Sequence, residues 1–376
     1  MNPADLMQGL PGDLIVNAIP VAFIMFVVLN FGGLLTWVER KQSAIMQDRI
    51  GANRASIFGI RILGLLHPLA DAIKMLTKED FMPARADKLM FVLAPFVSVF
   101  FALAAFASIP FGDTLYLFGR EIVLQAVTLN VGILYVLGML SLGVYGLMMA
   151  GWASANNYAL LGGQRAAALM ISAEIAIGAS IMGVVMVYGS LDLQDIARGQ
   201  GQPLLPKVFG NWIPAWGIVT QPLAFFLFLT AGIAATKRIP FDMPEGESEI
   251  IGYFVEYSGM KFGMFAMADF LETVVIAGMT TALFLGGWQV PYLHASGFVF
   301  PWGGTVAVPH LAVVGLQVGS FLLKVVVLIW LLMLIRWTLP RFRYDQAMRL
   351  GWLGLFPLSI LNIAITGLVL LLLGNG

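Results

Sequence analysis

The sequence predicts an all-α, polytopic membrane helix bundle of about eight transmembrane helices with one amphipathic interfacial helix. Two observations support this fold class. Hydrophobic residues make up 59% of the 376 residues and charged residues only 11%, whereas a soluble domain carries about 25% charged residues. Long stretches with few or no charges also recur along the chain, and each is longer than the roughly 20 apolar residues that cross a bilayer. We therefore expect lipid to replace water over most of the exterior.

Eight apolar stretches are the predicted spans, and with their loops they form a single membrane domain. Most of them contain no charged residue, but three carry charges that a lipid-facing position would not tolerate. The predicted spans cover residues 14–38, 89–112, 122–150, 166–191, 212–235, 262–288, 311–335 and 350–373.

Residues 57–78 have a different pattern. Arg61, Asp71, Lys74 and Lys78 keep this segment from spanning the membrane. Its apolar residues fall on one face of a helix, which predicts a helix lying in the membrane interface and bent or broken near Pro68. That face consists of Ile62, Leu65, Leu66, Leu69 and Ile73.

The basic residues predict the orientation. Eight spans put both termini on one side, and the loops on the opposite side then hold 17 of the 21 Lys and Arg residues. Cytoplasmic loops carry such an excess. We therefore expect a multi-pass protein of the inner (cytoplasmic) cell membrane, with both termini on the outer, periplasmic side. Arg120, Arg198 and Lys207 lie on the terminal side, and Lys324 lies within a span.

Four ionisable residues lie near the middle of the predicted spans. Glu174, Asp269, Glu272 and Lys324 are 8 to 12 residues from the nearest cytoplasmic-side charge, at depths of roughly 12 to 18 Å. Ionisable groups at this depth mark functional sites. Burial raises the pKa of a carboxyl and a nearby amine lowers it, so groups that exchange protons at neutral pH are expected here. The alternative is a static ion pair that orients helices.

The predicted cytoplasmic loop 237–261 is acidic. It contains Asp242, Glu245, Glu247, Glu249 and Glu256. If Pro244 opens a short helix, Glu245 and Glu247 complement its dipole, which is an ordinary structural role. In such a helix Glu245 and Glu249 share a face, and their repulsion favours keeping one of them protonated. Spacing alone supports the structural and the functional role equally.

Several classes of function are excluded. The net charge is zero, which removes the case for nucleic-acid binding, and there is no cysteine to hold zinc or an iron–sulfur cluster. We expect no metal site. Loop 37–55 is basic, which by composition alone indicates binding of anionic lipid or a topology signal. The chain contains neither a nucleotide-binding motif nor a hydrolytic nucleophile motif.

Several motifs resemble those of one family. They are VERKQSAIMQDRIGANRA, LADAIKMLTKED, WASANNYALLGGQRAA with ISAEIAIG, RIPFDMPEGESEI, EYSG, LFLGGW and LPRFRYDQAMRLGW. In this order, from about Val38 to the last span, they resemble the H subunit of respiratory complex I, the proton-pumping NADH:quinone oxidoreductase. The resemblance implies tilted helices, a long interfacial helix and a tunnel for quinone, which is the substrate. It implies that this chain alone holds no cofactor, because FMN and iron–sulfur clusters belong to partner subunits.

The resemblance also implies roles for individual residues and partners. The partners are cytoplasmic iron–sulfur and quinone-site subunits and antiporter-like membrane subunits. The residues matching the tunnel and its entrance are Glu39, Arg40, Lys41, Arg49, Arg54, Arg61 and Asp71. Those matching the path that couples quinone reduction to proton movement are Glu174, Glu245, Glu247, Glu249 and Glu256, and we add Asp242, Asp269, Glu272 and Lys324.

The sequence departs from the family pattern at two places. Ala235 stands where relatives often have an acid, and Asp269 stands where they often have Glu. Glu272 is an additional acid one helical turn after Asp269. We hypothesise that Glu272 compensates for the missing or shortened carboxyl.

Three other interpretations are compatible with part of this pattern. The first is the homologous membrane subunit of a hydrogenase- or ferredoxin-linked complex, the second an autonomous ion transporter, and the third an anchor for soluble proteins. Transporters usually show repeats or discontinuous helices, and an anchor leaves the buried charges unexplained. Ubiquinone and menaquinone fit equally well, as do proton and sodium coupling.

Overall fold

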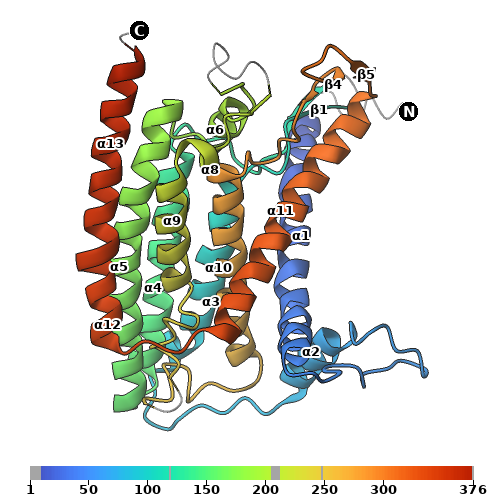
Figure 1. Ribbon diagram of the computed structural model, residues 1–376. Helices are drawn as coiled ribbons and strands as arrows, with labels where there is room; N and C mark the ends of the chain where they lie inside the picture. Colours follow the sequence, from blue (N-terminus) through green and yellow to red (C-terminus); the bar gives the residue numbers. More distant parts are fainter. Residues whose placement is uncertain (1–9, 118–119, 205–211, 247–248, 375–376) are drawn as a thin grey trace.

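The computed structural model describes residues 10–117, 120–204, 212–246 and 249–374. It confirms an all-α, polytopic bundle (Figure 1). Among the described residues, seven helices are long and apolar enough to cross a membrane. They are α1 (Leu10–Met46), α3 (Lys88–Ala104), α4 (Gly132–Ala153), α5 (Asn157–Tyr188), α10 (Gly259–Phe284), α11 (His310–Thr338), and α12 (Tyr344–Arg349) continued by α13 (Phe356–Gly374).

The eighth expected span is short. Residues 212–235 contain α8 (Gly217–Thr220) and α9 (Pro222–Ala235), which has 14 residues. The break falls at Gln221, because a residue that precedes proline avoids helical backbone angles. The Gln221 side chain accepts a hydrogen bond from Asn362 and donates one to Thr366, both on α13, so the polar group at the break is satisfied inside the bundle.

Helix α10 is the central element of the bundle. It packs against α1, α3, α9 and α11, and every residue from Leu271 to Phe284 is buried. In Figure 1, α5 and α13 lie on one side of it and α1 and α11 on the other. Closely approaching small residues hold neighbouring helices together: a Cβ on Gly146 of α4 would lie 2.2 Å from the Ser98 hydroxyl of α3. Small residues allow such contact between helices in membranes.

The predicted interfacial helix is shorter than expected. Helix α2 covers only His67–Thr77, and residues 57–66 form turns in which Phe58 and Leu63 have positive φ. Pro68 lies in the first turn of α2, where proline starts a helix rather than bending one. None of the α2 residues is buried, and its apolar side chains Leu69, Ile73 and Leu76 are exposed.

Other boundaries also differ from the prediction. Helix α1 continues to Met46, eight residues past the predicted span, so Glu39, Arg40 and Lys41 lie on a helix and not in a loop. Residues Arg120–Val123 form strand β2, paired antiparallel with β1 (Thr114–Leu117), so α4 begins only at Gly132. A short apolar run does not distinguish a strand from a helix. Helix α5 begins nine residues before the predicted span, because Asn156 caps it by accepting a hydrogen bond from the Tyr158 backbone.

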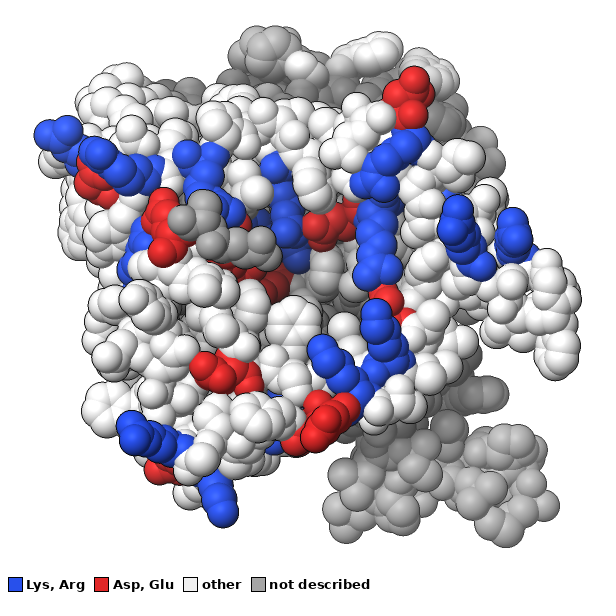
Figure 2. Space-filling model, turned by 90° about the horizontal axis from the view of Figure 1, so that it is seen from below, with Lys and Arg blue, Asp and Glu red and all other residues white. Residues whose placement is uncertain are grey.

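The two ends of the bundle differ in structure. One end carries β1–β2, the sheet of β3 (Leu293–His294), β4 (Gly297–Val299) and β5 (Thr305–Ala307), and α6 (Leu193–Gly199), together with the start of α1 and the end of α13 (Figure 1). Lys and Arg side chains are spread over the other end, with Asp and Glu between them (Figure 2). We call this second end the α2 end.

Candidate functional site

An apolar cavity lies between α1, α2 and α10 near the α2 end. Its volume is about 560 Å³, within the range of small-molecule sites. Four of the residues predicted for the tunnel line it, namely Glu39, Arg40, Arg49 and Asp71. Arg40 and Asp71 form an ion pair of 2.7 Å between Nη2 and Oδ2. The cavity can hold a largely apolar ligand with a few polar groups at its head.

The other predicted tunnel residues lie elsewhere. Lys41 donates a hydrogen bond to the carbonyl of Ile50, and Arg54 and Arg61 belong to the turns that precede α2. None of these three lines the apolar cavity. The resemblance assigns all seven residues to the tunnel and its entrance. Which of their side chains face the cavity depends on how α1 and α2 pack together.

A charged cavity of about 140 Å³ lies next to the apolar cavity. Lys237 is its centre: this side chain is almost wholly buried, and its Nζ lies 2.8 Å from Asp269 Oδ1 and 3.1 Å from Glu272 Oε2. Helix α9 ends two residues earlier, which directs Lys237 towards α10. The residues lining this cavity are Glu39, Thr236, Lys237, Arg238, Asp242, Glu245, Ala266, Asp269, Phe270 and Arg336.

Glu39 faces both cavities. Its Oε1 lies 2.7 Å from Arg336 Nη1 and its Oε2 lies 3.4 Å from Arg238 Nη1. The Arg238 guanidinium in turn lies over the ring of Phe270, with 4.4 Å between its central carbon and the ring centroid. Glu39 is thus the one carboxylate of the described chain that lines both the apolar and the charged cavity.

The loop groups of the charged cavity have shifted pKa values. Burial and the nearby carboxyls of Asp269 and Asp242 raise the pKa of Glu245 well above its ordinary value. Burial also raises the pKa of Asp242, although Arg341, at 2.7 Å, opposes this. Burial alone would lower the pKa of Lys237, but Asp269 and Glu272 raise it instead. The pKa values of these three loop groups are thus linked, because a cation and several carboxyls line one small cavity.

The described part of the acidic loop does not form the short helix that we considered after Pro244. Pro244 and Glu245 form a bend, and Glu245 and Glu249 face different surroundings. Glu249 pairs with Arg165 at 2.7 Å, and Glu256 accepts a hydrogen bond from Asn156. Only Asp242 and Glu245 reach the charged cavity. Glu247 lies outside the described residues.

Glu174 lies beyond the charged cavity on α5. Its Oε2 accepts a hydrogen bond of 2.7 Å from Ser141 of α4. A narrow cavity of about 10 Å³ separates Glu174 from Glu272, and Ala235 and Thr236 line it as well. Such a space holds about one water molecule. Thr236 also lines the charged cavity, so the two cavities are adjacent.

Lys324 does not join the carboxyls, contrary to the expectation of one level across the bundle. Its Nζ donates to the carbonyls of Gly287 at 3.0 Å and Gln289 at 2.7 Å and lies over the ring of Trp216. Gly287 is 15 residues after Glu272, or about 20 Å along the chain direction of α10. The partner of the buried carboxyls is Lys237. In the sequence, this residue contributes only to the excess of basic residues that predicts the orientation. Its place directly after an apolar span, in the KRIPFD motif, was the signal that could have identified it.

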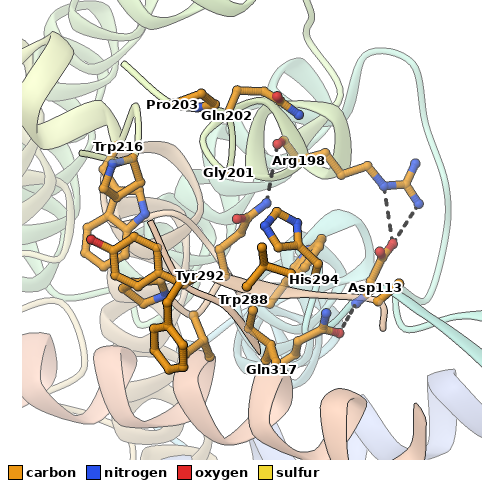
Figure 3. Close-up of a pocket in the computed structure, with 18 of the residues that line it drawn as sticks. Asp113, Arg198, Gly201, Gln202, Pro203, Trp216, Trp288, Tyr292, His294 and Gln317 are labelled. Atoms are coloured by element: carbon orange, nitrogen blue, oxygen red, sulfur yellow. Dashed lines mark hydrogen bonds and ion pairs between the residues drawn. The ribbon is translucent and has the colours of Figure 1, made fainter. Parts of the chain in front are cut away.

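A second large cavity, of about 540 Å³, lies at the opposite end of the bundle (Figure 3). Arg198 pairs with Asp113 at 2.8 Å, and the Asp113 backbone donates to Gln317. Aromatic side chains, among them Trp216 and Tyr292, form another part of the wall. None of the predicted site residues that the structure describes lines this cavity. Within the described part of the chain, no cluster of His, Asp or Glu could hold a metal ion.

A polytopic helix bundle with an apolar cavity beside a cluster of buried charged side chains defines a class of multi-pass membrane protein. The chain belongs to the NADH dehydrogenase family, whose model matches residues 19–367.

Curated relatives match over nearly the whole chain, and each is the H subunit of an NADH-quinone oxidoreductase. The one from Geobacter metallireducens is 44% identical over 96% of this chain and 98% of its own length. The one from Geobacter sulfurreducens is 43% identical over 97% and 99%. The one from Thermomicrobium roseum is 44% identical over 93% and 94%. The resemblance to this family expected from the motifs is thereby confirmed.

Proposed function

We propose that this chain is the membrane subunit of a proton-pumping NADH:quinone oxidoreductase that holds the quinone and couples its reduction to proton translocation. One observation carries the proposal: three cavities follow one another through shared residues. Glu39 lines the apolar and charged cavities, and Thr236 lines the charged and narrow cavities. A ligand in the apolar cavity is therefore linked to Glu174 through two further cavities that adjoin one another.

The cofactors, the substrate and the partners are assigned as follows. This chain has no cysteine to ligate an iron–sulfur cluster. As the family implies, we assign the clusters and FMN to partner subunits and take quinone as the substrate. The series Glu39, Lys237, Asp269, Glu272 and Glu174 is assigned to coupling. As a complex I subunit the chain assembles with other subunits, and we assign iron–sulfur and quinone-site subunits to its α2 end and antiporter-like subunits to the membrane.

We place the α2 end on the cytoplasmic side of the inner cell membrane. The excess of Lys and Arg predicted for the loops on this side, 17 of 21 residues, supports this orientation, because cytoplasmic loops hold such an excess. Both termini then face the periplasm. A protease-cleavable tag at the C-terminus of α13 tests this orientation. If a protease in the cytoplasm cleaves the tag and a protease on the periplasmic side does not, the orientation is wrong.

Asp71→Asn tests the quinone site in the purified complex. The variant leaves Arg40 unpaired beside the apolar cavity, so we expect the KM for quinone to rise by about tenfold, equal to about 1.4 kcal/mol. Electron transfer from NADH to a hydrophilic artificial acceptor should stay unchanged. Glu121→Gln, an exposed acid on β2 at the other end, is the matched control.

Three results would contradict the proposal, and the first two concern the complex. One is a quinone KM in Asp71→Asn equal to that of the control variant. The other is purification of the intact complex with ferredoxin-linked or hydrogenase subunits in place of those that oxidise NADH, which would favour the homologous complexes. Ion flux catalysed by the isolated chain in liposomes would favour an autonomous transporter instead.

A further inference from the structure

The apolar and charged cavities have few lining residues in common. Only Glu39, Ala266 and Phe270 line both of them among the described residues. Ala266 and Phe270 lie four residues apart on α10, so they share one face of the helix. Ala266 contributes a single methyl group, and Glu39 is the polar contact between the two spaces. The phenyl ring of Phe270 is therefore the bulk of the apolar wall.

The same ring holds a buried cation. The Arg238 guanidinium lies 4.4 Å from the centroid of Phe270, and its side chain is only 10% exposed. Its Nε has no hydrogen-bond partner in the structure, and its Nη1 reaches Glu39 only at 3.4 Å. An aromatic face attracts a guanidinium most strongly when water is excluded. Phe270 thus provides a contact that keeps Arg238 beside Glu39.

From this geometry we propose that Phe270 is a positioning residue that partitions the two cavities. Its ring keeps the charged cavity closed to the apolar cavity and fixes Arg238, so that a ligand headgroup acts on the buried charges only through Glu39. This inference rests on the proposed function, because it assigns the apolar cavity to quinone. Without the ring, spaces of about 560 and 140 Å³ would merge, and water would reach Lys237 and its carboxylates.

Phe270→Ala in the complete complex, reconstituted into proteoliposomes, tests the partition. We expect the ratio of protons pumped to electrons transferred to fall by about half while quinone reduction continues. The reason is that the buried charges then no longer respond to the ligand through Glu39 alone. Hydration of the cluster should also move the pH profile of quinone reduction by about one unit. Phe270→Tyr keeps the ring and should retain both properties of the native complex.

Phe262→Ala is the control for cavity shape. Phe262 lines the apolar cavity on the same helix but not the charged cavity, so its removal should change the quinone KM and leave the pumping ratio unchanged. Phe270→Leu carries the test if Phe270→Ala does not assemble: it fills space without offering a ring face to Arg238, and should shift the pH profile in the same direction by a smaller amount.

The outcomes separate the two proposals. The partition would be overturned if Phe270→Ala kept the native pumping ratio and pH profile while Phe262→Ala had an altered quinone KM. If only Phe270→Leu assembles, the same result in that variant would overturn it. The quinone site would remain supported in either case. An unchanged quinone KM in every variant would overturn the assignment of the cavity itself.

Discussion

At the scale of single residues, side chains that lie far apart along the chain can line the same cavity. Ala235 and Glu272 lie on different helices, yet both line the narrow cavity that contains Glu174. The family pattern that the motifs resemble places an acid at the position of Ala235, and the carboxyl of Glu272 reaches the same cavity from α10. This geometry supports the hypothesis that Glu272 compensates for the missing acid.

Glu272→Gln should lower coupled turnover by about a hundredfold, the lower end of what a positioned proton-transfer group contributes. The double variant with Ala235→Glu should restore much of it, because the acid then returns to the same cavity from α9. Proton uptake and quinone reduction in proteoliposomes measure both effects. Native turnover and pumping in Glu272→Gln would refute the compensation.

Glu245 makes stability depend on pH. Its pKa is raised well above the ordinary value of 4.5 by burial and by neighbouring carboxyls, so the folded protein holds this proton more tightly than the unfolded chain. The stabilising contribution is complete below pH 4.5 and is lost as the pH rises towards the folded pKa. We expect the melting temperature of Glu245→Gln to exceed that of the native protein increasingly as the pH is raised. A difference that is constant from pH 5 to about 9 would contradict this sign.

At the scale of helices, close packing depends on positions that look alike in the sequence. Gly138 and Gly146 both lie on α4, but a Cβ on Gly138 meets nothing within 4 Å, whereas one on Gly146 would overlap Ser98 of α3. Hydropathy identifies α4 as a span and does not distinguish these faces. The difference arises only when α3 and α4 pack together.

Gly146→Ala should therefore destabilise the protein by about 1 to 3 kcal/mol, the usual cost of overpacking. Gly138→Ala should be neutral or stabilising, since alanine favours helix by up to about 1 kcal/mol over glycine. Thermal unfolding of the two variants in one detergent gives the comparison. Equal melting temperatures would mean that the α3–α4 contact adjusts without cost.

At the scale of the whole molecule, the sequence allowed the bundle to be predicted better than its site. Long apolar runs identify spans because the bilayer demands them, and the four acids of the coupling series that lie within or beside spans were all singled out. The partners were not predictable. Lys237 finds Asp269 and Glu272 only because α9 ends beside the middle of α10, and Lys324 is drawn to backbone carbonyls at the other end. Such pairings come from tertiary packing, which periodicity along one helix does not contain.

The depth of the charged cavity has an electrical consequence. Asp269 is ten residues from the start of α10, or about 15 Å along the helix, so we expect it to lie about halfway through the roughly 30 Å hydrocarbon core. A proton that reaches Asp269 from either face should then cross about half of the transmembrane voltage. Since a full crossing is worth about 2.3 kcal/mol per 100 mV, the energy of loading the cavity changes by about 1 kcal/mol in an energised membrane. We therefore expect the proton occupancy of these groups to depend on voltage as well as on pH, so that a respiring membrane would act back on the site that we propose for coupling.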